Sequence, residues 1–153
     1  GSLAAEEVWR GFVEGMPQGL PAEGDRGLDR THTWGRTYWG GALFCLLADV
    51  AIRERTKGER SLDDALKGVL AAGGSISGRW SLGRTLDVAD GAVGGHALRE
   101  LYARLGSRPA SADLDGLWKR LGLVVRAGRV EFDEAAPLAG LRRAITRGPT
   151  PRP

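Results

Sequence analysis

The segment ALFCLLADV, residues 42–50, constrains the fold of this chain more than any other part of the sequence. Every residue in it except Asp49 is apolar, and it lies within a predicted helix at residues 38–55 that Lys57 and Gly58 should end. A helix that is apolar on all sides is stable only when neighbouring elements cover nearly its whole circumference. Either the rest of the chain supplies that cover, or a neighbour outside the chain does.

Apolar periodicity, capping residues and glycine breaks predict a mainly α-helical fold, a bundle of about six helices with a small β-hairpin near the C-terminus. Besides the central helix and a short helical stretch at 82–92, helices are expected at residues 2–14, 61–72, 96–105, 113–121 and 135–146. The apolar stretches 123–126 and 129–132 flank Ala127-Gly128, which favours a hairpin turn. Residues 16–36 should form a long loop that leads to Tyr38.

Local spacing also predicts several polar contacts. Ser61 is placed to cap the helix that follows it, as Ser2 is for the first helix. Asp63 and Asp64 lie in the first helical turn, where carboxylates complement the helix dipole. This explains the two adjacent carboxylates better than acid–base chemistry does. In the central helix, Asp49 and the arginine four residues later can pair.

The length of 153 residues suits one domain, which we expect to span residues 1–148, followed by a disordered, proline-rich tail at 149–153. Gly1-Ser2 resembles the remnant of a cleaved expression tag, so we expect the natural N-terminus to be absent. No stretch approaches the roughly 20 apolar residues that a membrane-spanning helix needs. We therefore expect no membrane partner.

The formal net charge is +3, and most arginines alternate with Asp and Glu on the predicted helices. Only the C-terminal end carries one sign of charge, at Arg142, Arg143, Arg147 and Arg152. No aromatic residues alternate with these arginines, so we expect a solvated end and no nucleic-acid partner.

The single cysteine, Cys45, cannot form an intrachain disulfide and is expected to pack in the core.

The central segment carries a further series of features: Tyr38 ahead of glycines, an aliphatic run ending in Asp49, then Ile-Arg-Glu-Arg-Thr, a glycine and Ser-Leu-Asp-Asp. This series resembles the C-terminal part of the catalytic domain of M61-type, glycyl aminopeptidase-like metallopeptidases and, more distantly, of M1 aminopeptidases. In those families a Tyr-x-Lys-Gly or similar motif opens a helix after the zinc site, and its tyrosine hydroxyl helps to stabilise the tetrahedral intermediate. The resemblance implies this catalytic role for Tyr38, although Gly40 stands where the families have lysine.

The zinc ligands of those families do not occur in this sequence. The families use His-Glu-x-x-His and a later glutamate, whereas His32 and His96 belong to no such motif. We therefore expect the chain to follow a zinc subdomain in a larger parent protein, to hold no metal or cofactor itself, and to be inactive alone. The resemblance implies zinc in the parent, the N-terminal zinc subdomain as the partner of this chain, and a peptide as substrate. The cellular location, including export of the parent, is left open.

Four residues around Tyr38 are candidate substrate contacts. Gly40 and Gly41 each cost a helix about 1 kcal/mol relative to alanine, so either a neighbouring element packs tightly against them or the substrate approaches there. His32 and Trp34 would line the same cleft as Tyr38; the alternative is that they are ordinary surface side chains. Tyr38 also has an ordinary interpretation, a ring packed at a helix start with its hydroxyl in water.

A second hypothesis is a non-catalytic helical protein-interaction module, which Gly40 in place of lysine favours. On either hypothesis we expect an exposed apolar surface around Trp34, Tyr38 and Trp39, where a zinc subdomain packs or two copies form a homodimer. His96 and Glu100 lie one helical turn apart, but two ligands are too few for a zinc site.

Overall fold

The computed structural model of the chain describes residues 3–147. Its elements follow one another as α1 Ala5–Gly15, the 3₁₀ turn η1 Met16–Gly19, α2 Trp34–Arg55, α3 Leu62–Ala71, α4 Leu82–Val93, α5 Ala97–Leu105, α6 Leu114–Leu121, β1 Leu123–Arg126, β2 Arg129–Phe132 and α7 Ala139–Thr146. This part of the chain is mainly helical with one antiparallel hairpin near its C-terminal end, which confirms the predicted fold class. The predicted cap at Ser2 and the predicted disordered tail lie outside the described residues.

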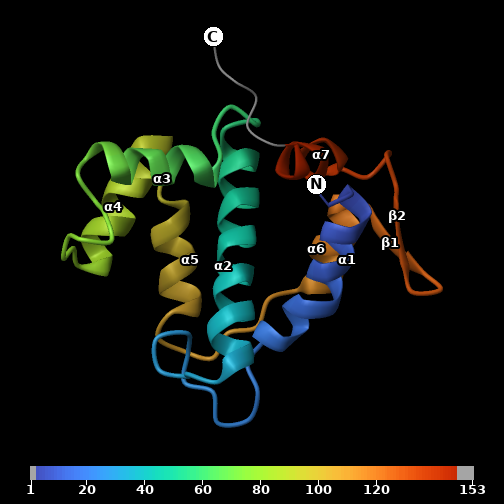
Figure 1. Cartoon of the computed structure of the whole chain (residues 1–153), viewed down its shortest axis with the longest axis horizontal. Coiled ribbons are helices and arrows are strands. Elements are labelled where there is room, and N and C mark those ends of the chain that lie inside the picture. Colours follow the sequence, from blue (N-terminus) through green and yellow to red (C-terminus); the bar gives the residue numbers. More distant parts are fainter. Residues whose placement is uncertain (1–2, 148–153) are drawn as a thin grey trace.

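Helix α2 runs through the centre of the molecule, with α3, α4 and α5 on one side and α1, α6, α7 and the hairpin on the other (Figure 1). Two separate clusters of buried apolar side chains meet it. Leu43, Leu46 and Val50 of α2 belong to the cluster shared with α1, α6 and the hairpin. Ala48 and Ile52 belong to the cluster shared with α3, α4 and α5. The chain's own elements therefore cover two sides of this helix.

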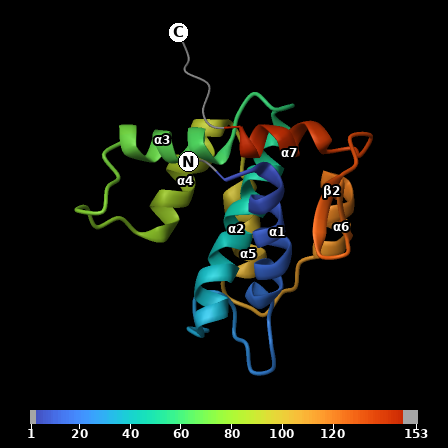
Figure 2. The same ribbon diagram turned by 45° about the vertical axis from the view of Figure 1, so that its right-hand side comes forward.

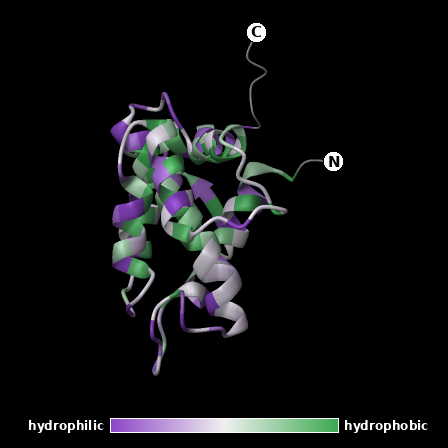
Figure 3. Ribbon diagram, turned by 90° about the vertical axis from the view of Figure 1, so that its left-hand side faces the viewer, coloured by the Kyte–Doolittle hydropathy of each residue, from purple (hydrophilic) through white to green (hydrophobic). Residues whose placement is uncertain are grey.

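Helix α7 lies across the top of the bundle, next to the C-terminal end of α2 (Figures 1 and 2). The helices carry apolar and polar residues side by side, whereas the connecting loops are mostly polar or neutral in hydropathy (Figure 3). Within residues 3–147, no helix has the length and apolarity that crossing a membrane requires.

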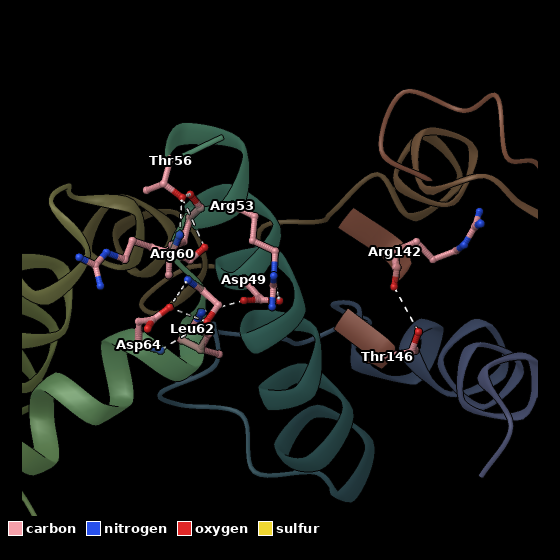
Figure 4. A network of polar contacts seen from close by, with 10 residues as sticks. Asp49, Arg53, Thr56, Arg60, Leu62, Asp64, Arg142 and Thr146 are labelled. Carbon is pink, nitrogen blue, oxygen red and sulfur yellow. Dashed lines mark hydrogen bonds and ion pairs between the residues drawn. The ribbon is translucent and has the colours of Figure 1, made fainter. Parts of the chain in front are cut away.

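Asp49 joins α2 to α3. Its Oδ2 accepts a hydrogen bond from Arg53 Nε at 2.8 Å, which confirms the predicted pair. Its Oδ1 accepts from the backbone N–H of Leu62 at 2.7 Å, in the first turn of α3 (Figure 4). Ser61 caps α3 as predicted, because its hydroxyl accepts from Asp64 N while the Asp64 carboxylate accepts from Ser61 N at 2.9 Å.

Three helix starts differ from the predictions. Helix α1 begins at Ala5, with Ala4 at its N-cap, rather than directly after Ser2. Helix α2 begins at Trp34 rather than Tyr38, because the Thr33 hydroxyl accepts from Arg36 N at 3.3 Å and starts the helix four residues earlier. The residues from Trp34 to Arg36 are therefore helical and not part of the approach loop. Helix α7 begins at Ala139 rather than at residue 135, because Pro137 lacks a backbone N–H and the preceding residues form a turn.

The hairpin has the predicted strands, with Arg126 opposite Arg129 and Val125 opposite Val130. Its two turn residues, Ala127 and Gly128, both have positive φ, at 49° and 74°. Tight hairpin turns of type I′ need this left-handed backbone at both central residues.

Arg142 is buried, contrary to the predicted solvated C-terminal end. Its Nη1 donates to the backbone carbonyl of Leu121 at 2.8 Å and to that of Gly122 at 3.2 Å. Its Nη2 forms an ion pair with Glu134, and the guanidinium lies 4.3 Å from the centre of the Phe132 ring. These partners lie at the C-terminal end of α6, in β2 and in the turn after β2, so the charge pattern near Arg142 in the sequence could not reveal them.

Asp90 of α4 closes the N-terminus of α5. Its side chain is buried, with Oδ1 accepting from Leu98 N at 2.9 Å and Oδ2 from Arg99 N at 3.0 Å. His96, the residue at the N-cap of α5, makes no capping side-chain hydrogen bond. The carboxylate of a neighbouring helix therefore takes the place of the usual local cap.

We expect Asp90→Ala to lower the free energy of unfolding by about 3 kcal/mol, because it removes two charge-assisted hydrogen bonds and leaves N–H groups buried. Chemical denaturation measures the change. Glu23→Gln, in an exposed loop, is the control and should change stability by less than about 0.5 kcal/mol. An Asp90→Ala protein as stable as this control would contradict the capping role.

Candidate functional site

One side of α2 is only partly covered by the rest of the described chain: Trp34, Tyr38 and Cys45 are exposed, whereas Ala42 is half-buried against the first cluster. Trp34, Tyr38, Ala42 and Cys45 follow one another at spacings of four, four and three residues, which places them along one side of a helix. We call these four residues the open stripe. The side chains of Trp34 and Tyr38 are each 64% exposed, and Cys45 is also exposed. This stripe contains the candidate catalytic tyrosine and one of the candidate substrate contacts.

The start of α2, which carries Trp34 in its first turn and Tyr38 in its second, is anchored by Arg36. This side chain is buried, and its Nε lies 2.8 Å from Asp25 Oδ2, at an angle that suits an ion pair but not a hydrogen bond. Its Nη1 donates to the carbonyl of Gly19. The Asp25 carboxylate also accepts from Gly27 N at 2.8 Å, so one ion pair ties the loop before α2 to the start of the helix.

Close backbone packing holds the start of α2 against η1. A Cβ atom added at Gly19 would lie 2.4 Å from the carbonyl carbon of Trp39 and 2.5 Å from the nitrogen of Gly40. A Cβ atom added at Gly15 would lie 2.0 Å from the Trp39 ring. Trp39 therefore points into the molecule, whereas Tyr38 points out of it. Of the three aromatic residues expected at an exposed surface, Trp34 and Tyr38 are exposed and Trp39 is mostly covered.

The two glycines after Trp39 have different surroundings. Gly40 is buried, and an added Cβ would lie 2.7 Å from Leu28 Cδ2, so tight packing describes this position. An added Cβ at Gly41 would meet nothing within 4 Å. Gly41 is thus the glycine that borders open space.

Tyr38 and Trp34 lie one helical turn apart with their rings in contact. The ring centroids are 5.5 Å apart and the planes are tilted by 42°. The Tyr38 hydroxyl has no hydrogen-bond partner within residues 3–147, so it is available to a ligand. His32 is exposed immediately before the Thr33 cap and makes no polar contact with the described residues. His32, Trp34 and Tyr38 are therefore all accessible near the start of α2.

Beyond Tyr38 the open stripe runs into a groove of about 410 Å³ between α1, α2, α3 and α7. Its lining is mainly apolar and includes Phe12, Ala42, Cys45, Leu66 and Ile145. Cys45 is accessible in this groove, so its predicted core position is wrong. Residues of α1 and α3 line the groove on either side without covering it. Partial burial among apolar neighbours raises the pKa of the Cys45 thiol above its ordinary value.

The part of the chain that the structure describes gathers no set of zinc ligands. In the described range 3–147, no three His, Cys, Asp or Glu side chains gather closely enough to hold a metal ion. His96 is exposed at the start of α5, and Glu100 one turn later forms an ion pair with Arg55. Any zinc bound by a larger protein would need ligands from outside these residues.

The sequence correctly placed Trp34 and Tyr38 at an exposed surface, but it placed Cys45 in the core and did not reveal the ion pair beneath the start of α2. An aspartate two residues before a glycine signals a turn in which the carboxylate accepts the glycine N–H, and Asp25 and Gly27 form that turn. The ion pair of Asp25 with Arg36 joins the two ends of a loop, and nothing in the local sequence indicates that the loop brings these residues together.

Compared with known proteins, the chain matches no protein-family model, no curated protein and no solved structure. A functional assignment therefore rests on the sequence resemblance and on the geometry of the open stripe.

The glycines around the start of α2 give a matched test of this geometry. We expect Gly19→Ala to lower the free energy of unfolding by about 2 kcal/mol, because its methyl group would overlap the backbone of α2. Gly41→Ala should instead raise it by up to about 1 kcal/mol, because alanine favours the helix and the space is open. Thermal and chemical denaturation measure both changes. Equal effects of the two substitutions would contradict the described packing.

Proposed function

We propose that this chain is the helical C-terminal part of an M61-like zinc aminopeptidase, in which the Tyr38 hydroxyl donates a hydrogen bond to the oxyanion of the tetrahedral intermediate. The observation that carries the proposal is the accessibility of Tyr38 on a helix that is packed on two other sides. A donor without a partner in the protein is free to meet the developing charge. Because such a donor works best when it is positioned before the reaction, the close packing at the start of α2 also supports the proposal.

The other predicted site residues have separate roles in this proposal. Trp34 contacts the Tyr38 ring and limits its movement, and together with His32 it lines the substrate cleft. Gly41 leaves room for a peptide backbone, whereas Gly40 keeps α2 close to η1. The helices wall the cleft, the zinc ligands belong to an N-terminal zinc subdomain that is the partner of this chain, and the substrate is a peptide.

A non-catalytic interaction module is the second candidate. The groove beyond Tyr38 favours it, because an accessible apolar groove between helices suits an amphipathic helix of a partner protein. Leu66, 53% exposed on the groove wall, adds to that surface. The two candidates differ in what the parent protein contains, since only the peptidase needs a His-Glu-x-x-His segment and a further glutamate upstream of this chain.

The two tyrosines of the chain allow a direct test of the catalytic proposal. In the full-length gene product, Tyr38→Phe should lower kcat for peptides with a small N-terminal residue by about 10²–10³-fold, because one oxyanion donor is lost. Tyr102→Phe is the matched control: the Tyr102 hydroxyl donates to Asp29 Oδ2 at 2.5 Å, a hydrogen bond that raises the pKa of Tyr102, and it lies on α5, a different helix from the open stripe. This control should leave kcat within about twofold.

Aminopeptidase turnover and zinc content are measured on the same preparations. The chain alone should show neither turnover nor stoichiometric zinc. Stoichiometric zinc with turnover in the chain alone would contradict the proposal, as would a full-length Tyr38→Phe protein with unchanged kcat. A full-length protein without zinc or turnover would favour the interaction module.

A further inference from the structure

A second groove, of about 490 Å³, separates the C-terminal turns of α2 from α7. The α7 side of the groove is apolar and the α2 side is charged, with a lining formed by Arg53, Glu54, Lys57, Gly58, Leu138, Gly140, Leu141 and Ala144. Its volume falls in the range of sites that bind small molecules. Fifteen residues of helix, about 22 Å, separate Arg53 from Tyr38. Tyr38 does not line the groove, so its proposed catalytic role and this groove can be tested separately. Arg53 also lines the groove beyond Tyr38, so the two grooves meet at this side chain.

Arg53 is held with part of its guanidinium unused. Its side chain is 16% exposed, and Nε donates to Asp49, whose other oxygen is bound by Leu62 N (Figure 4). Nη1 and Nη2 have no partner within residues 3–147, and neither is a buried atom, so both are accessible. A fixed guanidinium with two free donors matches the geometry of a carboxylate.

Lys57 adds a second cation at the rim. It is exposed and has no ion-pair partner in the described part of the chain. Its φ of 53° is left-handed, a backbone conformation in which glycine or asparagine is the usual residue. The acidic neighbour Glu54 forms an ion pair with Arg120, which offsets its repulsion of an anion. The nearby carboxylates Asp49 and Glu54 are each already paired with an arginine, so within residues 3–147 Lys57 is the cation on this rim that has no ion-pair partner.

The opposite wall suits an apolar chain. Leu138 is buried, and Leu141 and Ala144 are half-buried. All three line the side of the groove that α7 forms. Burying methylene groups against such side chains is favourable, at about 0.8 kcal/mol for each CH₂ group in general. The negative end of the α2 dipole opposes an anion at this position, and Arg53 and Lys57 offset that opposition.

We propose that this groove binds an apolar chain that ends in a carboxylate. The carboxylate pairs with Nη1 and Nη2 of Arg53 and with Lys57, and the chain lies along Leu141 and Ala144. A medium-chain fatty acid and the free C-terminus of an apolar peptide share this chemistry.

Titration calorimetry with decanoate, decanol and decylamine tests the charge requirement. Decanoate should bind at least tenfold more tightly than either analogue, as one charge-assisted hydrogen bond predicts. In NMR spectra, the methyl signals of Leu141 and Ala144 should shift on addition of decanoate, while that of Leu43 should not. Equal binding of the three compounds, no binding of decanoate, or shifts only elsewhere would overturn the proposal.

An acetylated leucine tripeptide and its C-terminal amide distinguish the two sources of the carboxylate. If the peptide acid binds more tightly than decanoate and the amide does not bind, the natural ligand is a peptide C-terminus. If decanoate binds more tightly, it is a fatty acid. Both results support the proposal, whereas equal binding of the peptide acid and its amide would overturn it.

Lys57→Asn separates binding from folding. Asparagine tolerates left-handed backbone, so this variant should keep or raise the melting temperature while lowering the affinity for decanoate by about tenfold. Lys67→Asn is the matched control, because Lys67 is exposed on α3, pairs with Asp63 and does not line the groove. Unchanged decanoate affinity in the folded Lys57→Asn protein, or an equal loss in both variants, would contradict the assignment.

Discussion

Helix α2 is shared by two apolar clusters that do not otherwise merge, and the rest of the structure depends on this sharing. The apolar sequence of the helix allows it, because side chains that point in opposite directions can both be buried. Leu43 and Val50 pack towards α1 and α6, while Ala48 and Ile52 pack towards α4 and α5. Polar contacts then fix the helix at two points, through Arg36 near its start and through Asp49 about two turns before its end.

Two clusters cover two sides of a helix and leave a third side to other partners. The open stripe from Trp34 to Cys45 is that third side, and Tyr38 lies on it at the closely packed start of the helix. A hydroxyl that stabilises charge must be held in position by the packing of its helix and must also be accessible to the substrate. A surface that recognises a partner protein needs the same two properties. The proposed functions therefore share one structural origin, and they differ in what meets the stripe.

Local patterns predicted the elements of the fold well. Ser61, Asp64 and the Ala127-Gly128 pair act within a few residues of themselves, so their roles can be read directly from the sequence. The pairing of Asp49 with Arg53, one helical turn later, can be predicted from the sequence for the same reason. The elements found this way include the central helix that carries the candidate site.

Features that depend on the path of the chain could not be predicted. Arg142 is buried because it binds the carbonyl groups of Leu121, Gly122 and Asp133, and Cys45 is accessible because it lines an open groove between α1 and α3. The sequence predicted a loop at Arg36, whereas this residue lies in the first turn of α2 and is buried against Asp25. At the candidate site, sequence alone identified Tyr38 and Trp34 but could not distinguish the packed Gly40 from the open Gly41.

Native-state hydrogen exchange tests the central claim, that α2 couples the two clusters into one cooperative unit. The slowest backbone amides of α5, α6 and α2 should exchange with the same free energy of opening, equal to that of global unfolding. Leu101, Trp118 and Leu46 report on the three helices. If the amides near Leu101 exchange through an opening of clearly lower free energy while those near Leu46 and Trp118 stay protected, the two clusters are independent and the account is contradicted.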